Sequence, residues 1–327
     1  DINIHQGRVQ WRFANREYLP QAYRSRTGLK FMAPAGKNKV ITYLQKGQRG
    51  IILPIVGRKS KAKEPPLIRS VDRRVQAAFA KAYGDKTYIA LYDNGQIELL
   101  AYDHKNGTYK KLTMIRADGL QALECNKEGV YLCYKEKEQA IVALFNHKGE
   151  RREVAKLKAK RAVCSYSSDD KVVFVLGNVA TIVKGTKERQ VKLDVLEEIV
   201  YFPPISIDDE DRAILISGIV PKRFNLVNTQ RVDMVYLSLN SGKTKHYKLG
   251  TTTLHAIRHL LKVGPARYKD KLYVGIGSHL QTVSSQPPFD VLQESFTTTT
   301  LKRVPIIYKE HIFIAVKKGN FYGHAVE

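Results

Sequence analysis

The feature of this 327-residue sequence that most constrains its fold is a segment that recurs about every forty residues. Each copy has an acid in a polar turn followed by a short apolar run, as in Asp85-Lys86 before Tyr88–Tyr92. The acids are Asp85, Glu128, Asp170, Asp211, Asp270 and Glu310. Successive acids are 43, 42, 41, 59 and 40 residues apart, and the long interval contains an insertion at Ile219–Arg231. Such a constant interval indicates a repeat architecture, so we expect the six acids to occupy equivalent turns.

The rest of each copy is typical of a small antiparallel sheet. The apolar run ends in a tight-turn signal such as Asp93-Asn94-Gly95, where Asn-Gly supplies the positive φ angles of a two-residue hairpin. Two further strands follow, as in Gln96–Tyr102 and Thr108–Ile115, and another candidate strand such as Leu120–Cys125 precedes each acid. Four strands per forty residues predict an all-β, six-bladed β-propeller over residues 77–327. Two stacked sandwiches are the alternative, but sandwiches need no constant interval.

The sixth copy has three strands before the sequence ends, so another segment must complete its sheet. The candidates are Val40–Leu44 and Arg49–Val56, which are apolar and lie upstream of the first copy. Pro54 fits an outer strand, where proline is tolerated. We therefore expect one of these segments to close the ring and Asp1–Gly36 to reach another subunit. On this hypothesis, removing residues 1–36 leaves a folded ring that no longer assembles.

Residues 1–76 are predicted to form a basic N-terminal arm. They hold 17 lysines and arginines against 4 acids, a net of +13 out of +24 for the whole chain. The densest basic run, Arg58–Lys63, precedes Pro65-Pro66, which does not fit the interior of a helix or sheet. Beyond the prolines, Leu67–Tyr83 has apolar residues at helical spacing, which predicts a short amphipathic linker helix.

The arm interleaves basic and aromatic residues, which suggests a contact surface. Lysine and arginine neutralise phosphates and release counterions, and aromatic rings stack on unpaired bases or anchor protein interfaces. The candidate residues for contact with nucleic acid or a partner are Arg8, Arg12, Arg16, Arg24, Arg26, Arg58, Lys59, Lys61, Lys63, Trp11 and Tyr18. Contact with other subunits, non-specific contact with DNA or RNA, and a plain solvated arm all stay open.

The last strands of four copies are also basic: they contain Lys110-Lys111, Arg151-Arg152, Lys187 with Arg189, and Lys243 with Lys245 and Lys248. In a propeller these strands lie on the outer circumference. Lysines on an exposed edge can simply block edge-to-edge aggregation, or they can form a binding rim. Both interpretations remain open from the sequence.

No pattern in the sequence predicts catalysis or a cofactor. It contains no glycine-rich phosphate loop, His-Glu-x-x-His pair or Gly-x-Ser-x-Gly elbow, so we expect neither an enzyme nor a bound cofactor. His255 and His259 are four apart on a helical-looking stretch, but no third ligand is nearby and no metal site is expected. The odd number of cysteines, Cys125, Cys133 and Cys164, predicts buried free thiols. No apolar run approaches 18 residues, so no membrane-spanning segment is predicted.

Several short elements of the first forty residues match a known kind of leader. The stretches Gln6–Val9, Arg16–Ala22, Gly28-Leu29-Lys30 and Ala33-Pro34 resemble the entry segment of some tail nozzle (tail tubular) proteins of short-tailed bacteriophages. In that family such a leader precedes a strand-rich body that bears a propeller. The resemblance implies a virion tail, a ring of subunits around the DNA path, and no catalysis. The chain departs from the family in its short length and strong positive charge.

Three functions are compatible with these patterns. The first is a non-enzymatic structural component of a nucleic-acid-containing assembly, most specifically a nozzle-type tail protein whose partners are its own copies or neighbouring virion proteins. The second is an intracellular propeller scaffold that binds nucleic acid or an acidic protein. The third is a propeller enzyme acting on an acidic polysaccharide, which requires His, Tyr and carboxylates clustered at one mouth of the ring.

Overall fold

A computed structural model provides the structure of the chain. It describes residues 2–3, 9–13, 28–35, 39–56, 69–158, 163–176, 178–185, 187–193, 199–207, 212–219, 229–253, 266–276, 279–297, 306–308, 311–315 and 321–325. Within these ranges all of the regular secondary structure is β-strand. No helix in the described ranges is long and apolar enough to cross a membrane.

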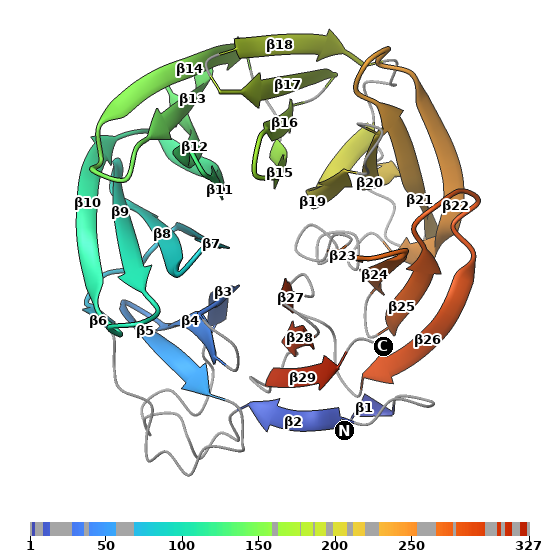
Figure 1. The fold of residues 1–327 in the computed structure, drawn as a ribbon, viewed down its shortest axis with the longest axis horizontal. Helices are drawn as coiled ribbons and strands as arrows, with labels where there is room; N and C mark the ends of the chain where they lie inside the picture. Colours follow the sequence, from blue (N-terminus) through green and yellow to red (C-terminus); the bar gives the residue numbers. More distant parts are fainter. Residues whose placement is uncertain are drawn as a thin grey trace.

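The described strands form seven antiparallel sheets arranged as the blades of a ring (Figure 1). Blade 1 contains β3 (Gly28–Pro34), β4 (Lys39–Lys46), β5 (Arg49–Val56) and β6 (Arg69–Val71). Blade 2 contains β7 (Ala77–Tyr83), β8 (Lys86–Asp93), β9 (Gln96–Asp103) and β10 (Tyr109–Arg116). Blade 3 contains β11 (Gly119–Asn126), β12 (Gly129–Glu136), β13 (Gln139–Phe145) and β14 (Arg151–Lys158). Blade 4 contains β15 (Val163–Ser167), β16 (Val172–Leu176), β17 (Val179–Lys184) and β18 (Lys187–Lys192).

The remaining three blades complete the circle. Blade 5 contains β19 (Ile199–Ile207), β20 (Arg212–Ile219), β21 (Thr229–Ser238) and β22 (Thr244–Thr253). Blade 6 contains β23 (Ala266–Tyr268), β24 (Lys271–Ile276), β25 (His279–Ser284) and β26 (Val291–Thr297), with the short β1 (Ile2–Asn3) at its outer edge. Blade 7 contains β27 (Ile306–Tyr308), β28 (His311–Ala315), β29 (Phe321–Ala325) and, as its outermost strand, β2 (Val9–Phe13).

The first strands of successive blades contact one another around the centre of the ring. The contacts run through β3, β7, β11, β15, β19, β23 and β27 and return to β3. The all-β propeller prediction is therefore confirmed, and the six predicted copies form blades 2 to 7. Blade 1 is one blade more than the repeat count predicted. The chain between β3 and β4 contains no Asp or Glu, so blade 1 lacks the signature that revealed the others.

The ring is closed by a different segment from the one predicted. β2 pairs with β29, with Arg12 opposite Tyr322 and Phe13 opposite Phe321. The predicted closing segments, Val40–Leu44 and Arg49–Val56, instead belong to β4 and β5 inside blade 1. The prediction that Asp1–Gly36 reaches away from the ring is wrong for β2 and β3, and the rest of the predicted arm that the structure describes forms blade 1 instead of a single closing strand. The expectation that a chain without residues 1–36 keeps a folded ring loses its basis, because that deletion removes β2 and β3.

The predicted linker helix over Leu67–Tyr83 is also wrong where the structure describes it. This segment contributes β6 and β7, with a connection of irregular structure between them. The Ala-rich sequence of β7 suits a helix, but Tyr83 pairs with Lys86 across a hairpin and the whole strand lies against the apolar β8. Burial between a neighbouring strand and adjacent blades outweighs a weak local helix propensity.

The recurring acid has a structural role in the turns that the structure describes. Asp85, Glu128, Asp170 and Asp270 all lie in the turn between the first and second strands of their blades, whereas Asp211 and Glu310 lie outside the described residues. In two blades the acid reaches a lysine at the next turn on the same side of the sheet: Asp85 to Lys105 and Asp170 to Lys184, both at 3.1 Å. The predicted equivalence therefore holds for these four acids.

The core is divided into layers between neighbouring sheets. The middle strands are buried on both faces, which explains their continuous apolar runs: in β12, Val130 through Tyr134 are all buried. Val130, Leu132 and Tyr134 pack towards blade 2, while Tyr131 and Cys133 belong to the layer shared with blade 4. Val130 is opposite Cys125 across the hairpin, and the three cysteines are free and buried, as their odd number predicted.

Glycines in the turns between third and fourth strands allow adjacent blades to meet at the rim. Gly149 has φ +92°, and a Cβ there would lie 2.7 Å from the carbonyl oxygen of Leu112 in blade 2. Gly242 has φ +73°, and a Cβ there would likewise overlap the carbonyl oxygen of Lys192 in blade 4. Each glycine therefore provides both a left-handed turn and room for the neighbouring strand.

We predict that alanine at Gly149 or Gly242 lowers the free energy of unfolding by about 2–4 kcal/mol, because backbone strain and steric overlap add. Gly185 provides a matched control, since it occupies the same turn of blade 4 with φ +57° but has no atom within 4 Å of an added Cβ. Gly185→Ala should lower the free energy of unfolding by about 1 kcal/mol, because it adds backbone strain without steric overlap. Urea unfolding of the three variants measures the difference, and equal losses would contradict the packing explanation.

Candidate polyanion-binding surface

The contact residues predicted in the N-terminal segment are largely outside the described part of the chain. Trp11 and Arg12 lie in β2, where the structure describes the backbone course but not the side chains. The candidates outside the described residues are Arg8, Arg16, Arg24, Arg26, Arg58, Lys59, Lys61, Lys63 and Tyr18. Their contacts therefore stay predictions.

The structure places the other predicted basic feature, the basic last strands of four copies, on the outside of the ring. β10, β14, β18 and β22 are the outermost strands of four consecutive blades (Figure 1). We call their exposed bases the basic belt: Lys110, Lys111, Arg116, Arg151, Arg152, Lys156, Lys187, Arg189, Lys192, Lys245 and Lys248. The exposed acids described on these strands are Glu153 and Glu188. The belt is therefore strongly positive over more than half of the circumference.

Two arginines of the belt also join neighbouring blades. Arg152 of blade 3 donates to the carbonyl of Gly185 in the rim turn of blade 4, at 3.2 Å. Arg189 of blade 4 repeats the contact one blade further on, donating to the carbonyl of Leu239 at 3.0 Å and to Asn240. These guanidinium groups stabilise the outer contacts between blades, so their positive charge has a structural role as well.

Several lysines of the belt have no such role in the described structure. Glu153 forms ion pairs with Arg151 and Lys156, at 3.4 and 3.3 Å, so its negative charge offsets part of blade 3. Lys187, Lys192, Lys245 and Lys248 form no ion pair with a described residue. A line of exposed ammonium groups can contact successive phosphates or carboxylates of a polyanion.

A second polar cluster joins the inner strands of blades 2, 3 and 4. The carboxylate of Glu124 is buried and lies 2.8 Å from the ammonium group of Lys81. The hydroxyl groups of Ser165 and Ser167 donate to its two oxygens at 2.8 and 2.6 Å. Burial lowers the pKa of Lys81, but the adjacent Glu124 more than compensates, so the pKa lies above the usual lysine value. Because both oxygens of Glu124 are engaged, the cluster fits a structural role.

Two histidines in rim turns hold the start of β8. Thr87 donates to the Pro34 carbonyl of blade 1 at 2.6 Å, so its oxygen is placed to accept from His104 Nε2 at 2.8 Å. Burial lowers the pKa of His104, which favours its neutral form. The hydroxyl of Tyr88 lies 2.8 Å from Nδ1 of His147 in blade 3. These contacts connect three blades through one strand.

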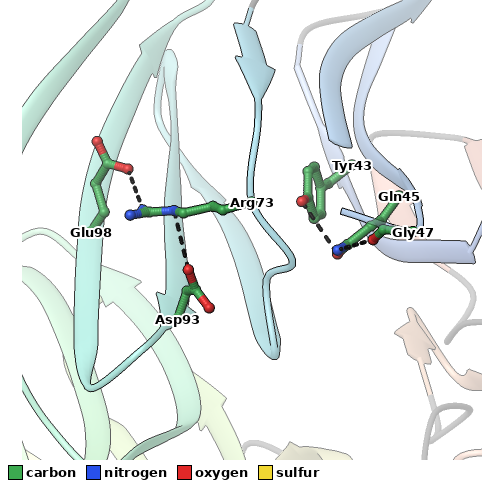
Figure 2. A network of polar contacts seen from close by, with 6 residues as sticks. All are labelled: Tyr43, Gln45, Gly47, Arg73, Asp93 and Glu98. Atoms are coloured by element: carbon green, nitrogen blue, oxygen red, sulfur yellow. Dashed lines mark hydrogen bonds and ion pairs between the residues drawn. The ribbon is translucent and has the colours of Figure 1, made fainter. Parts of the chain in front are cut away.

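A further polar group lies at the junction of blades 1 and 2. Figure 2 shows Arg73, in the connection between the blades, reaching Glu98 at 3.1 Å and Asp93 at 3.7 Å. In blade 1, Tyr43 donates to Gln45, which donates to the Gly47 carbonyl at 3.0 Å. The two acids are buried and share one arginine, so this group stabilises the entry into blade 2.

The described residues contain neither a group of metal ligands nor a reactive thiol at Cys133. No group of three or more His, Cys, Asp or Glu side chains within them is placed to hold a metal ion. His255 and His259 lie outside the described residues. Burial raises the pKa of Cys133 to about 12, so its thiol stays protonated and unreactive at neutral pH.

Comparison with known proteins supports the fold. No protein-family model matches the chain, and the search of curated proteins finds no match. The N-terminal domain of Nup159 aligns with a TM-score of 0.57 and 9% identity, covering 99% of this chain and 95% of that domain. BamB from Moraxella catarrhalis aligns with a TM-score of 0.54 and 11% identity, over 91% of this chain and 83% of BamB. At such identities these similarities show a propeller fold alone.

Proposed function

We propose that this protein is a non-enzymatic propeller scaffold of a nucleic-acid-containing assembly, and that its basic belt contacts the nucleic-acid backbone. The observation that carries the proposal is the concentration of eleven exposed bases and two exposed acids on four adjacent outer strands. A chain with a net charge of +24 attracts polyanions over long distances, and the basic belt is the surface that would contact them.

Edge protection alone does not account for the belt. One or two lysines are enough to block pairing at an edge strand, whereas β10 and β18 each carry three exposed bases. Backbone contacts of this kind are independent of base sequence and weaken steeply with salt. The proposal therefore specifies non-specific binding, without readout of base edges.

The test is fluorescence anisotropy of a labelled DNA duplex over a series of salt concentrations. The binding variant carries Lys187→Gln, Lys192→Gln, Lys245→Gln and Lys248→Gln, which leave the arginine contacts intact. If most of the four contact phosphates, the slope of log K against log salt should fall by about 3, since each contact contributes about 0.9. The matched control, with Lys46, Lys127, Lys137 and Lys148 changed to Gln, loses the same charge from the end of β4 and from three turns.

Each outcome has a distinct meaning. A loss confined to the belt variant supports the proposal, whereas an equal loss in both variants would show that net charge, not the belt, drives binding. Absence of duplex and single-strand binding at low salt would overturn the proposal. Binding of polyglutamate that outcompetes nucleic acid would favour the acidic-protein scaffold.

The most specific form of the proposal is a nozzle-type protein of a virion tail. It is supported by the resemblance of the N-terminal leader, whose last elements, Gly28-Leu29-Lys30 and Ala33-Pro34, lie in β3 at the start of the ring. It requires a ring of subunits in the virion, so the mass of the assembly isolated from its native source tests it.

A further inference from the structure

The basic belt follows a curved path, because the strands that carry it run along the perimeter of the ring. Figure 1 shows β10, β14, β18 and β22 following one another around the outside of blades 2 to 5. These strands have 8, 8, 6 and 10 residues. At about 3.3 Å per residue the belt is about 100 Å long. It covers four of the seven blades, so it turns through about 200°.

The positive charge of the belt passes directly from one blade to the next. The turn that leads into β14 lies against Leu112 in β10. Arg152 of β14 donates at 3.2 Å to the carbonyl of Gly185, in the turn that leads into β18. Arg189 of β18 donates at 3.0 Å to the carbonyl of Leu239, in the turn that leads into β22. Each outer strand therefore begins beside the preceding one, and the four strands form one track.

The belt has two ends, so its charge follows an arc and not a full circle. Beyond one end, β26 of blade 6 contains neither Lys nor Arg. Beyond the other end, β6 of blade 1 is three residues long and has Arg69 as its one base. A polyanion that follows the whole arc contacts Lys110 and Lys111 in blade 2 and, at the far end, Lys245 and Lys248 in blade 5.

The curvature of this arc is too tight for a nucleic-acid duplex. A duplex along the whole arc would turn through about 200° in only three or so helical turns, since it rises about 3.4 Å per base pair. The bend would be roughly 50–70° per helical turn, compared with about 45° per turn on the nucleosome. The nucleosome sustains its bend by inserting arginines into the minor groove at every helical turn. A belt of surface lysines and arginines gives no such support, so a duplex contacts only part of the arc.

We propose that the basic belt binds single-stranded nucleic acid along its whole arc. This inference rests on the proposed function and specifies its substrate. An unpaired strand is flexible between phosphates, so it follows a curved basic track and contacts both ends of the belt at once. The belt therefore discriminates a single strand from a duplex by stiffness, without contact to base edges.

The experiment compares a labelled deoxythymidine strand of about 30 nucleotides with a duplex of the same length, by anisotropy over a series of salt concentrations. Even with its bases stacked, a strand of about 30 nucleotides reaches about 100 Å. Two variants change opposite ends of the arc: Lys110→Gln/Lys111→Gln in blade 2 and Lys245→Gln/Lys248→Gln in blade 5.

The two ligands should respond differently to these variants. For the single strand, each variant should lower the slope of log K against log salt by about 1.4, because each lost phosphate contact contributes about 0.7. For the duplex, at most one of the two variants should lower the slope, because a stiff ligand does not contact both ends. A duplex with a single-stranded gap at its centre should again respond to both variants, because the gap acts as a hinge.

Lys127→Gln/Lys137→Gln is the matched control, since it removes the same charge from the turns between the inner strands of blade 3. It should leave both slopes unchanged. The inference is overturned if both end variants lower the slope of the intact duplex, if the single strand responds to one end alone, or if the control lowers its slope as much. Failure of the single strand and the duplex alike to bind would instead overturn the belt proposal itself.

Discussion

A chain that lacks residues 1–13 is expected to lose the closed ring and to unfold at a much lower temperature. The deletion removes β2, which pairs with β29 and ties the start of the chain to its end, together with β1. Without this tie, blades 1 and 7 become the ends of an open array, in which each end blade loses cooperative support from one neighbour. A loss of several kcal/mol corresponds to a fall in Tm of about 5–10 °C for a chain of this size, with a broader transition.

Two comparisons separate ring closure from a general effect of truncation. Removing residues 1–3 deletes β1 and leaves β2, so its Tm should stay close to that of the full chain. Adding a synthetic peptide of residues 7–14 to the longer deletion should restore part of the lost stability, because the edge of β29 is then paired again. Calorimetry measures both. A deletion of residues 1–13 that unfolds like the full chain would contradict the assignment of β2 as the closing strand.

The second large effect is expected at Glu124, on the inner strand of blade 3. Glu124→Ala removes the common partner of Lys81, Ser165 and Ser167 and leaves three polar groups unpaired near the core. Breaking a buried ion pair costs about 3–5 kcal/mol, but Lys81 is 37% exposed and solvent compensates part of the loss. We therefore expect the free energy of unfolding to fall by about 2–4 kcal/mol in urea denaturation.

The pH dependence gives this prediction a second readout. The pKa of Lys81 is raised in the folded chain, so its contribution is fully present below the unfolded lysine pKa of about 10.5 and is lost as the pH rises through the folded value. The advantage of the unmodified protein over Glu124→Ala should therefore shrink above about pH 10.5. Glu124→Gln keeps an acceptor for the serines and should cost less. Equal losses in both variants would contradict the importance of the charge.

Local sequence patterns predicted much of each blade, because turn conformation and strand burial depend on a few neighbouring residues. Asn94 and Gly95 have φ of 44° and 74°, the left-handed pair that the Asp-Asn-Gly sequence predicted for a hairpin. The continuous apolar runs followed from burial on both faces of the middle strands, and the polar last strands followed from exposure at the rim. The outer position of the bases was therefore predictable, whereas the role of Arg152 and Arg189 as contacts between blades was not, since their acceptors are 33 and 50 residues away.

The amino-acid sequence by itself determined the repeat length, the turns and the alternation of buried and exposed strands, because hairpins are set by a few neighbouring residues. Only the tertiary structure decided how many blades close the ring and which segment closes it. β4 and β5 are as apolar as any closing strand must be, yet they pair with β3 and form a blade of their own. β2 has five residues within a basic segment and was not singled out as a strand, but the open edge of β29 selects it. Pairing between the two ends of a chain depends on where all the intervening blades place those ends, and no local pattern contains that information.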